Sequence, residues 1–450
     1  MSARSGWLAA DGVIRRIFNA AAAVIVAGIL VKLVATLKEV TVAGVYGRSD
    51  AMDAFLAAAL IPGLLINLIS ESMNQALVPT LIRVRELEGH DRAQQLLSSA
   101  MLWTTVLLAA AAGGMGLFAR VFFPLIASHF PVAKLELAVH LFYVLLPVVV
   151  LTGIAANCTA VLNTFDHFAL PALAPVVTPL AILICAPLLS QHMGIWAMVY
   201  GTLTGALIHA ACVAWMMDAS GYRFRLRWYG MNEAAREVAH QYGPMLLSSV
   251  VASGGLLVDQ SMAAMLPAGS VSALVYANRC VSVVVTLLAG AVSSAVVPYF
   301  STMVAQNDWA ACRQTLRTWG WLTAFISTPI AVSLIAGSHL LIRVAFQHGA
   351  FGPEDTAVVT PVLAMYAIQI PFFVCSRVFY RFLVAMRRTD LIFYCGLLNL
   401  GLDIPLNMIL MRRLGVAGIA LATSLWTVST FLFLWYWARK LLRERSEGAQ

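Results

Sequence analysis

Charged residues are scarce in this sequence. Only 11% of its 450 residues are Asp, Glu, Lys or Arg, whereas 61% are hydrophobic. Soluble domains contain about 25% charged residues, so a chain with so few charges must place most of its surface in lipid. The composition therefore excludes an ordinary soluble enzyme and favours a protein that crosses the membrane many times.

The sequence also lacks the common signatures of catalysis, metal binding and nucleic-acid binding. Its seven cysteines are scattered and form no CxxC pair, so neither a disulfide framework nor a zinc site is expected. No acidic metal motif or nucleophile–base pair supports a membrane enzyme such as a glycosyltransferase or O-antigen ligase, and no basic, aromatic module is present to hold nucleic acid. We expect no removable signal peptide, because no short apolar region with a cleavage site precedes the first long apolar segment.

Long apolar segments dominate instead. A transmembrane helix needs about 20 mainly apolar residues, and about twelve segments meet this requirement, which predicts an all-α polytopic membrane protein. The segments on the same side of the membrane as the N-terminus carry about 18 Lys and Arg, and those on the opposite side carry about 6. Because positive charges favour the cytoplasmic side and the number of spans is even, both termini are expected in the cytoplasm. The segments cover roughly residues 18–45, 52–82, 94–122, 136–162, 168–190, 193–217, 237–265, 270–304, 310–336, 356–386, 389–411 and 415–438.

An internal duplication organises these segments. The stretch 53–84 resembles the stretch 272–303, and Pro79 matches Pro298, 219 residues later. This offset predicts two pseudo-symmetric six-span lobes, arranged as parallel repeats that bind substrate between them. The segment 218–234, which links the two lobes, alternates arginines with aromatic and apolar residues. This pattern favours a segment that anchors the protein on anionic lipid headgroups. The predicted parts are an N-lobe (1–217), a cytoplasmic linker (218–234) and a C-lobe (235–450).

Several apolar segments contain charges that are costly in lipid. A charge at the bilayer centre costs roughly 2.5–3.5 kcal/mol unless it has a partner, faces a cavity or snorkels. The first segment contains VKLVATLKEV, with Lys32, Lys38 and Glu39, and the eighth contains Arg279. We interpret these residues as a cationic cavity for an anionic headgroup, because lysine and arginine suit phosphate. The alternative is internal ion pairing and snorkelling, and Lys32 and Glu39 share a helix face that would let them pair. Asp53 opens the second segment, where a negative charge favours the helix N-terminus; it is also a candidate substrate-binding residue.

The second half contains a different set of polar residues. Asp259, Asn399, Asp403 and Thr423 carry the oxygen atoms that hard cations prefer. A sodium ion or a proton bound there would couple transport to an ion gradient, whereas the alternative is hydrogen bonding between helices. Arg377 and Arg381 lie four residues apart on one helix face. They are candidates for a second-lobe cavity, or for ion-pair partners that would make the carboxylates structural.

Several stretches resemble the MviN/MurJ-type lipid II flippases of the multidrug/oligosaccharidyl-lipid/polysaccharide exporter superfamily. The resemblance implies a V-shaped, two-lobed transporter in the bacterial inner membrane that moves undecaprenyl-pyrophosphate-linked sugars from the inner to the outer leaflet for peptidoglycan synthesis. Besides this substrate and membrane lipids, envelope-synthesis enzymes are candidate partners. It also implies that Lys32, Lys38 and Arg279 stand where the family has cavity arginines, and Glu39 where it has an acidic residue. The stretches are AMDAFLAAALIPGLL (51–65), NQALVPTL (74–81), AGSVSALVYANR (268–279), AFQHGAFGPEDT (345–356), SRVFYRFLVAMRRTD (376–390) and GVAGIALATS (415–424).

The sequence also departs from this family pattern. The places of an arginine pair that is common in the family are taken by Ile66 and Asn67. Lysines stand in place of cavity arginines at positions 32 and 38, and lysine lacks the planar fork of arginine. The family also usually has two further spans, which build a groove for the lipid tail. A flippase for an exopolysaccharide or O-antigen unit is therefore an alternative. A drug/cation antiporter of the same superfamily should instead have an acidic cavity, and a non-transporting scaffold is a further alternative.

Overall fold

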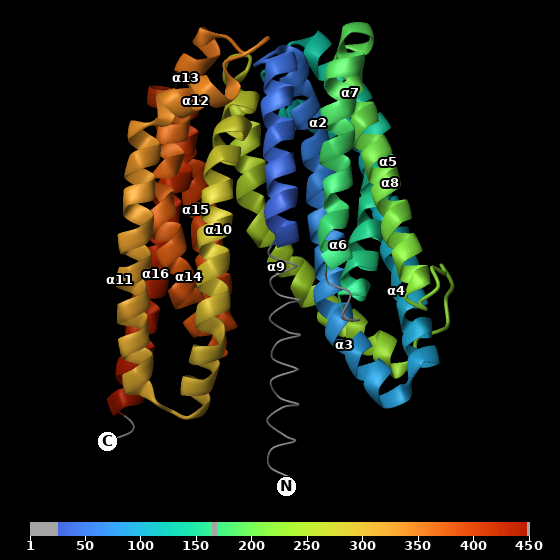
Figure 1. Ribbon diagram of the computed structural model, residues 1–450, viewed down its shortest axis with the longest axis vertical. Helices are drawn as coiled ribbons and strands as arrows, with labels where there is room; N and C mark the ends of the chain where they lie inside the picture. The colour runs from blue at the N-terminus through green and yellow to red at the C-terminus, as the bar shows by residue number, and fades with distance from the viewer. Residues whose placement is uncertain (1–25, 164–168, 448–450) are drawn as a thin grey trace. The chain divides into compact units, whose positions relative to one another are not determined.

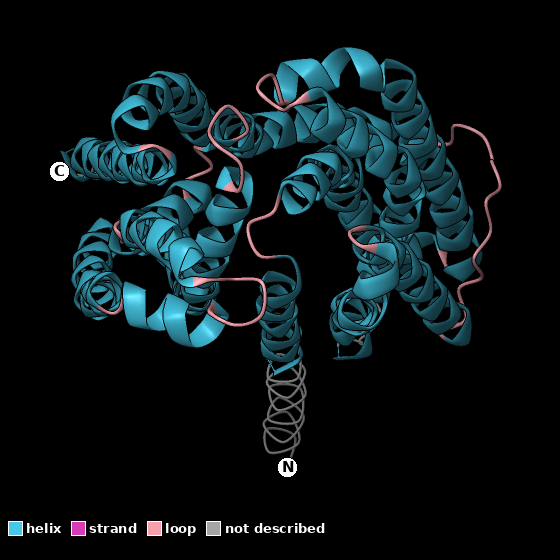
Figure 2. Cartoon of the chain, turned by 90° about the horizontal axis from the view of Figure 1, so that it is seen from above, coloured by secondary structure: helices cyan, strands magenta, loops and turns pink. Residues whose placement is uncertain are grey.

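The computed structural model describes residues 26–163 and 169–447 (Figure 1). Helices joined by loops make up this described part of the chain, and Figure 2 shows no strand in it. Eleven helices among the described residues are long and apolar enough to cross a membrane, by length and composition. They coincide with the second to twelfth predicted segments. The first predicted segment begins outside the described residues, but its described part, 26–46, is helical. The prediction of an all-α polytopic membrane protein is confirmed.

The helices after residue 46 follow one another through short loops, apart from the longer linker between Ala219 and Glu233. The loop before α11 shows how such a loop ends: the Asp308 side chain caps the helix by accepting a hydrogen bond from the Ala311 backbone N–H over 2.9 Å. In chain order the elements are α2 (Asp50–Ile66), the π-helix η1 (Asn67–Glu71), α3 (Ser72–Glu88), α4 (His90–Ile126), α5 (Val132–Leu162), α6 (Ala169–Leu173), the 3₁₀-helix η2 (Ala174–Val176), α7 (Val177–Met193), α8 (Trp196–Ala219), α9 (Glu233–Ala263), α10 (Ser270–Ala305), α11 (Trp309–Ala336), α12 (Ser338–Phe346), α13 (Pro353–Ala367), α14 (Gln369–Ala385), α15 (Thr389–Leu414) and α16 (Val416–Glu447).

The helix boundaries follow the predicted duplication. Five helices in the second half begin 219 to 221 residues after a helix in the first half. The pairs are α2 with α10, α4 with α11, α5 with α13, α6 with α15, and α8 with α16. Such agreement along the chain supports two halves of common construction, as parallel-repeat transporters have.

The chain forms two compact units. The first contains residues 58–123 and 133–250 together with the described residues before 46, and the second contains 46–57, 124–132 and the described residues from 251 onward. The start of α2 thus packs with the second unit, while its remainder packs with the first. The predicted lobe boundary at 218–234 stays a prediction.

Large apolar side chains hold each unit together. In the first unit, Leu77, Leu97, Val161 and Val213 belong to one buried cluster contributed by α3, α4, α5 and α8. In the second unit, Tyr276 lies with its ring centroid 5.8 Å from that of Phe346 and 6.1 Å from that of Phe351. Aromatic pairs at these distances stabilise packing beyond the area they bury, so the loop before α13 is fixed to α10.

The linker predicted to contact lipid packs along α4 of the first unit. The Gln94 side chain accepts a hydrogen bond from the Arg223 backbone N–H over 3.0 Å and donates one to the Arg223 carbonyl over 2.9 Å. Trp228 meets Trp103 edge to face, with 5.6 Å between ring centroids. The linker is therefore held on the helix surface with Arg223, Arg225 and Arg227 exposed; its contact with lipid headgroups stays a prediction.

Candidate functional site

Two buried carboxylates meet within the second unit. Asp259 lies on α9, and Asp403 and Asn407 lie on α15. The Asn407 Nδ2 atom donates to Oδ1 of Asp259 over 2.8 Å and to Oδ1 of Asp403 over 3.0 Å. Thr423, on α16, donates its hydroxyl to Oδ2 of Asp259 over 3.0 Å. Three helices thus converge on one polar group, which we call the carboxylate cluster (Asp259, Asp403, Asn407 and Thr423).

The carboxylate cluster presents oxygen atoms of the kinds that bind small cations. Asp403 Oδ2 and Asn407 Oδ1 are buried oxygens to which no described residue donates a hydrogen bond. Gly255 lies beside Asp403 Oδ2, because a Cβ added there would lie 3.4 Å from that oxygen. Oxygen atoms of carboxylate, amide and hydroxyl groups are ligands for hard cations. Two neighbouring carboxylates also repel each other when both are ionised, so a bound cation or a shared proton would stabilise this arrangement.

The structure places three of the four residues predicted for this site in the cluster. The fourth, Asn399, is one turn before Asp403, and its Oδ1 accepts a hydrogen bond from the Thr430 hydroxyl over 3.0 Å. The amide of the cluster comes instead from Asn407, one turn after Asp403. Asn407 is absent from the predicted residues, although the four-residue spacing that pairs Asn399 with Asp403 applies to it equally.

The two arginines predicted for the second lobe lie among aromatic rings on α14. The Arg377 guanidinium is 4.2 Å from the centroid of Phe373, and those of Arg377 and Arg381 are 5.7 and 5.8 Å from the centroid of Tyr380. Such contacts stabilise a half-buried guanidinium through cation–π attraction. Among the described residues no ion pair joins either arginine to the carboxylate cluster. A role for these arginines in a cavity stays a prediction.

The lysines of the first helix differ in their surroundings. Lys38 Nζ lies 2.7 Å from Oε1 of its neighbour Glu39, and both side chains are largely buried. The suggested pairing of Glu39 with Lys32 spans seven residues, about 10 Å along a helix, so the adjacent lysine is the nearer partner. Lys32 is exposed, near the middle of the predicted first span. An exposed ammonium at that depth needs water or an anionic ligand, which suits Lys32 to the predicted headgroup cavity.

Asp53 and Arg48 fix the start of α10. Asp53 is buried, and its carboxylate accepts hydrogen bonds from the backbone N–H groups of Gly269, over 2.7 Å, and Ser272, over 2.9 Å. Arg48 donates through Nε to the Gly269 carbonyl over 3.0 Å and through Nη1 to Asp355 over 3.2 Å. Gly269 has a φ of 79°, and a Cβ there would lie 2.7 Å from the Arg48 carbonyl oxygen, so this position requires glycine.

Asp53 therefore caps a helix, as its sequence position suggested, but it caps α10 and not α2, the helix in which it lies. A part for Asp53 in substrate binding stays a prediction. Arg279, in the third turn of α10, is exposed, and its contact with a headgroup stays a prediction.

A further ionisable residue lies on the π-helix within the second span. η1 joins α2 to α3 in a span of 39 residues, and π-helical turns frequently mark functional sites. Glu71 ends η1, is exposed, and accepts a hydrogen bond from Gln75 over 3.3 Å. Nearby, Asn74 donates to the Ala156 carbonyl over 3.4 Å. Glu71 is absent from the predicted residues, although it meets the criterion that identified Lys32, an ionisable group within an apolar span.

Comparisons with known proteins agree over most of the chain. The model of a family described as lipid II flippase MurJ matches residues 42–448. A protein of Synechocystis sp. named as a probable lipid II flippase MurJ is 24% identical over 447 residues, which cover 95% of this chain and 82% of the relative.

Solved structures show the same fold. A lipid II flippase MurJ in an inward closed conformation matches with a TM-score of 0.81 and 24% identity, over 92% of this chain and 87% of that one. An inward-facing multidrug transporter of the MATE family matches with a TM-score of 0.71 and 12% identity, over 93% of this chain and 96% of that one.

Proposed function

Because this chain belongs to the MurJ family of lipid II flippases, we propose that it moves an undecaprenyl-pyrophosphate-linked saccharide from the inner to the outer leaflet of the bacterial cytoplasmic membrane. The observation that carries the proposal is the family match over nearly the whole chain. The polytopic helical fold and its repeated helix spacing support transport by alternating access. MATE transporters of this fold have been solved in inward-facing and outward-facing conformations.

Lys32 and Arg279 are proposed to hold the pyrophosphate. Both side chains are exposed. A cationic side chain at membrane depth is retained only where it is solvated or has an anionic partner. A pyrophosphate would be an anionic ligand for both side chains during transport and would favour the conformation in which it binds them. Lys38, paired with Glu39, would contribute a weaker field, since its charge is already balanced.

The carboxylate cluster is proposed to bind the coupling ion, a sodium ion or a proton. Asp259, Asp403, Asn407 and Thr423 would hold it through oxygen atoms, and the ion would neutralise part of the carboxylate charge. Its binding would then depend on how α9, α15 and α16 pack, because these three helices supply the ligands. An ion gradient could thereby drive a conformational change of the second unit.

The proposed function is tested by depleting the protein in its host and identifying the accumulated undecaprenyl-linked intermediate by mass spectrometry. We expect lipid II to accumulate, and re-expression of the wild-type chain to restore its normal level. Accumulation of a different repeat unit would identify an exopolysaccharide or O-antigen flippase instead, an alternative favoured by Ile66 and Asn67 at the places of the family's arginine pair. No change in any lipid-linked saccharide would contradict both functions.

A further inference from the structure

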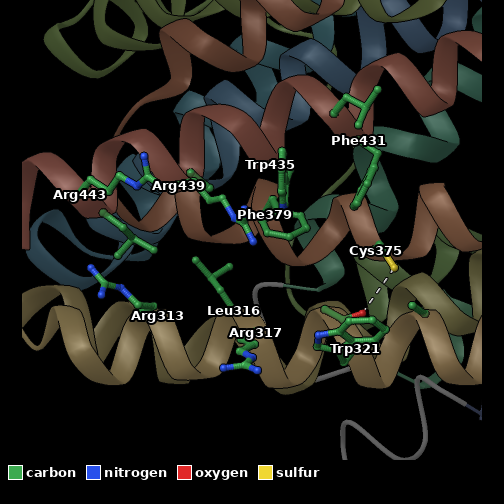
Figure 3. Close-up of a pocket in the computed structure, with 15 residues that line it drawn as sticks. Arg313, Leu316, Arg317, Trp321, Cys375, Phe379, Phe431, Trp435, Arg439 and Arg443 are labelled. Atoms are coloured by element: carbon green, nitrogen blue, oxygen red, sulfur yellow. Dashed lines mark hydrogen bonds between the residues drawn. The ribbon is translucent and has the colours of Figure 1, made fainter.

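A groove runs along the second unit between α11, α14 and α16 (Figure 3). Its larger part is a cavity of about 1160 Å³, and a smaller cavity of about 350 Å³ adjoins it. The two cavities share the lining residues Ala324, Cys375 and Phe431. We call it the α11–α16 groove. None of the residues proposed above to bind the pyrophosphate or the coupling ion lines it.

One end of the α11–α16 groove is basic. Arg313 and Arg317 contribute from α11, and Arg439 and Arg443 contribute from α16; Figure 3 shows the two pairs on separate helices on either side of the cavity. The described residues that line the groove include no carboxylate. The Arg439 guanidinium stacks on Trp435, 4.1 Å from its ring centroid, and this contact orients the charge. The loop charges predict that this end lies at the cytoplasmic membrane surface.

The remainder of the groove is apolar and aromatic. Trp321, Phe379 and Trp435 line it nearer the arginines and Phe431 lies farther along, as Figure 3 shows; Val332 lines the smaller cavity. From Arg317 to Val332 the α11 helix rises about 22 Å at 1.5 Å per residue. Half of a bilayer's hydrocarbon core is about 15 Å thick. The apolar part is therefore long enough to hold an acyl chain that starts at the membrane surface.

We propose that the α11–α16 groove binds an anionic phospholipid of the inner leaflet. The headgroup phosphate would lie at the end lined by Arg317 and Arg439, with charge-assisted hydrogen bonds to the guanidinium groups. An acyl chain would lie along the aromatic residues toward Ala324 and into the smaller cavity. The phosphate would also reduce the repulsion between Arg317 and Arg439, which come from two helices, so the lipid would stabilise the packing of α11 against α16.

A resident phospholipid fits this groove better than the transported substrate does. Every residue that lines it belongs to the second unit. In transporters built from two repeats, the substrate binds between the repeats and is released when they move. A site walled by three helices of one unit moves as one body with that unit, and so retains its ligand through the transport cycle.

The proposal is tested by native mass spectrometry of the purified full-length chain, titrated with phosphatidylglycerol or with phosphatidylcholine of the same acyl chains. The wild-type chain should retain phosphatidylglycerol in preference to phosphatidylcholine. The double variant R317Q/R439Q should bind phosphatidylglycerol about tenfold more weakly or worse, because two charge-assisted contacts are lost. R412Q/R413Q is the matched control, because it removes two exposed arginines of the same unit outside the groove, and it should bind as the wild type does.

Ala324→Phe tests the apolar part without changing charge. The added ring would obstruct the junction of the two cavities, so long-chain phosphatidylglycerol should bind about tenfold more weakly while a short-chain form binds normally. Equal binding of the two lipid classes by the wild type, or undiminished binding by R317Q/R439Q, would overturn the proposal. So would recovery of a polyprenyl-linked lipid or a single-span partner protein, rather than phospholipid, cross-linked to this groove. If R317Q/R439Q does not fold, R317K/R439K keeps the charge and should retain the preference for phosphatidylglycerol; its loss of that preference would also overturn the proposal.

Discussion

Replacing Asp403 by Asn is a direct test of the carboxylate cluster. Oδ1 of Asp259 and Oδ1 of Asp403 accept hydrogen bonds from the same nitrogen of Asn407, at 2.8 and 3.0 Å, so these oxygens lie at most about 5.8 Å apart. Two unit charges at that separation repel by about 3 kcal/mol at an effective dielectric constant of about 20. A cation about 3 Å from each oxygen is attracted by about 5–6 kcal/mol per carboxylate on the same scale.

Asp403→Asn removes one such attraction, about 5–6 kcal/mol of cation binding on this scale, of which the amide oxygen of the new asparagine restores a part. We therefore expect cation affinity to fall by at least a hundredfold. The cation-free protein should become more stable, because the repulsion between the two carboxylates is lost. Thermal unfolding of the purified chain, with sodium replaced by a bulky organic cation and over a series of pH values, measures both effects. Flux in proteoliposomes, with and without sodium and pH gradients, measures the coupling.

Asp390→Asn is the matched control for this experiment. Asp390 lies on the same helix as Asp403, but it is exposed and pairs with Arg388 at 2.8 Å, so its replacement should leave the response to cations unchanged. Loss of stability in Asp403→Asn at every cation concentration and pH would mean that the cluster only bonds helices together. Coupling through this site is refuted if wild-type unfolding and flux are indifferent to sodium, to pH and to the membrane potential.

Three further outcomes are expected. Lys32→Ala and Arg279→Ala should each reduce flux at least tenfold at normal membrane expression, because each loses a charge-assisted contact to the substrate, whereas Lys32→Arg should be tolerated; normal flux in both alanine variants contradicts the proposed headgroup site. Asp53→Ala should destabilise the second unit by about 2 kcal/mol, because the buried N–H groups of Gly269 and Ser272 at the start of α10 lose their acceptor, and a lower unfolding temperature checks this. Thiol labelling from outside the cell should reach single cysteines introduced at positions 50, 267 and 350 and miss those at 88, 230 and 445; reversed labelling would overturn the predicted orientation.

The fold was largely predictable because hydropathy in lipid is a strong constraint. A spanning segment must satisfy every backbone hydrogen bond internally, which leaves the helix as the natural solution for each long apolar run. The spacing of Pro79 and Pro298 indicated the duplication that the helix boundaries follow. The π-helix at Asn67–Glu71 was not predictable in the same way, because one extra residue in a helical turn leaves the mean hydropathy of the span unchanged.

The candidate site was predictable in its residue types but not in its contacts. Asn399, Asp403 and Asn407 lie at successive four-residue steps on one face of α15, so helical periodicity alone assigns both asparagines equally to Asp403. Their neighbours on other helices distinguish them: Thr430 donates to Asn399, whereas Asp259 accepts from Asn407. Leaving a buried carboxylate without a hydrogen-bond donor costs far more free energy than leaving a hydroxyl without an acceptor, because the carboxylate is charged. Asn407, rather than Asn399, therefore supplies the amide that binds both carboxylates. Which of the two asparagines does so depends on how α9 packs against α15, and the sequence of α15 alone does not determine that packing.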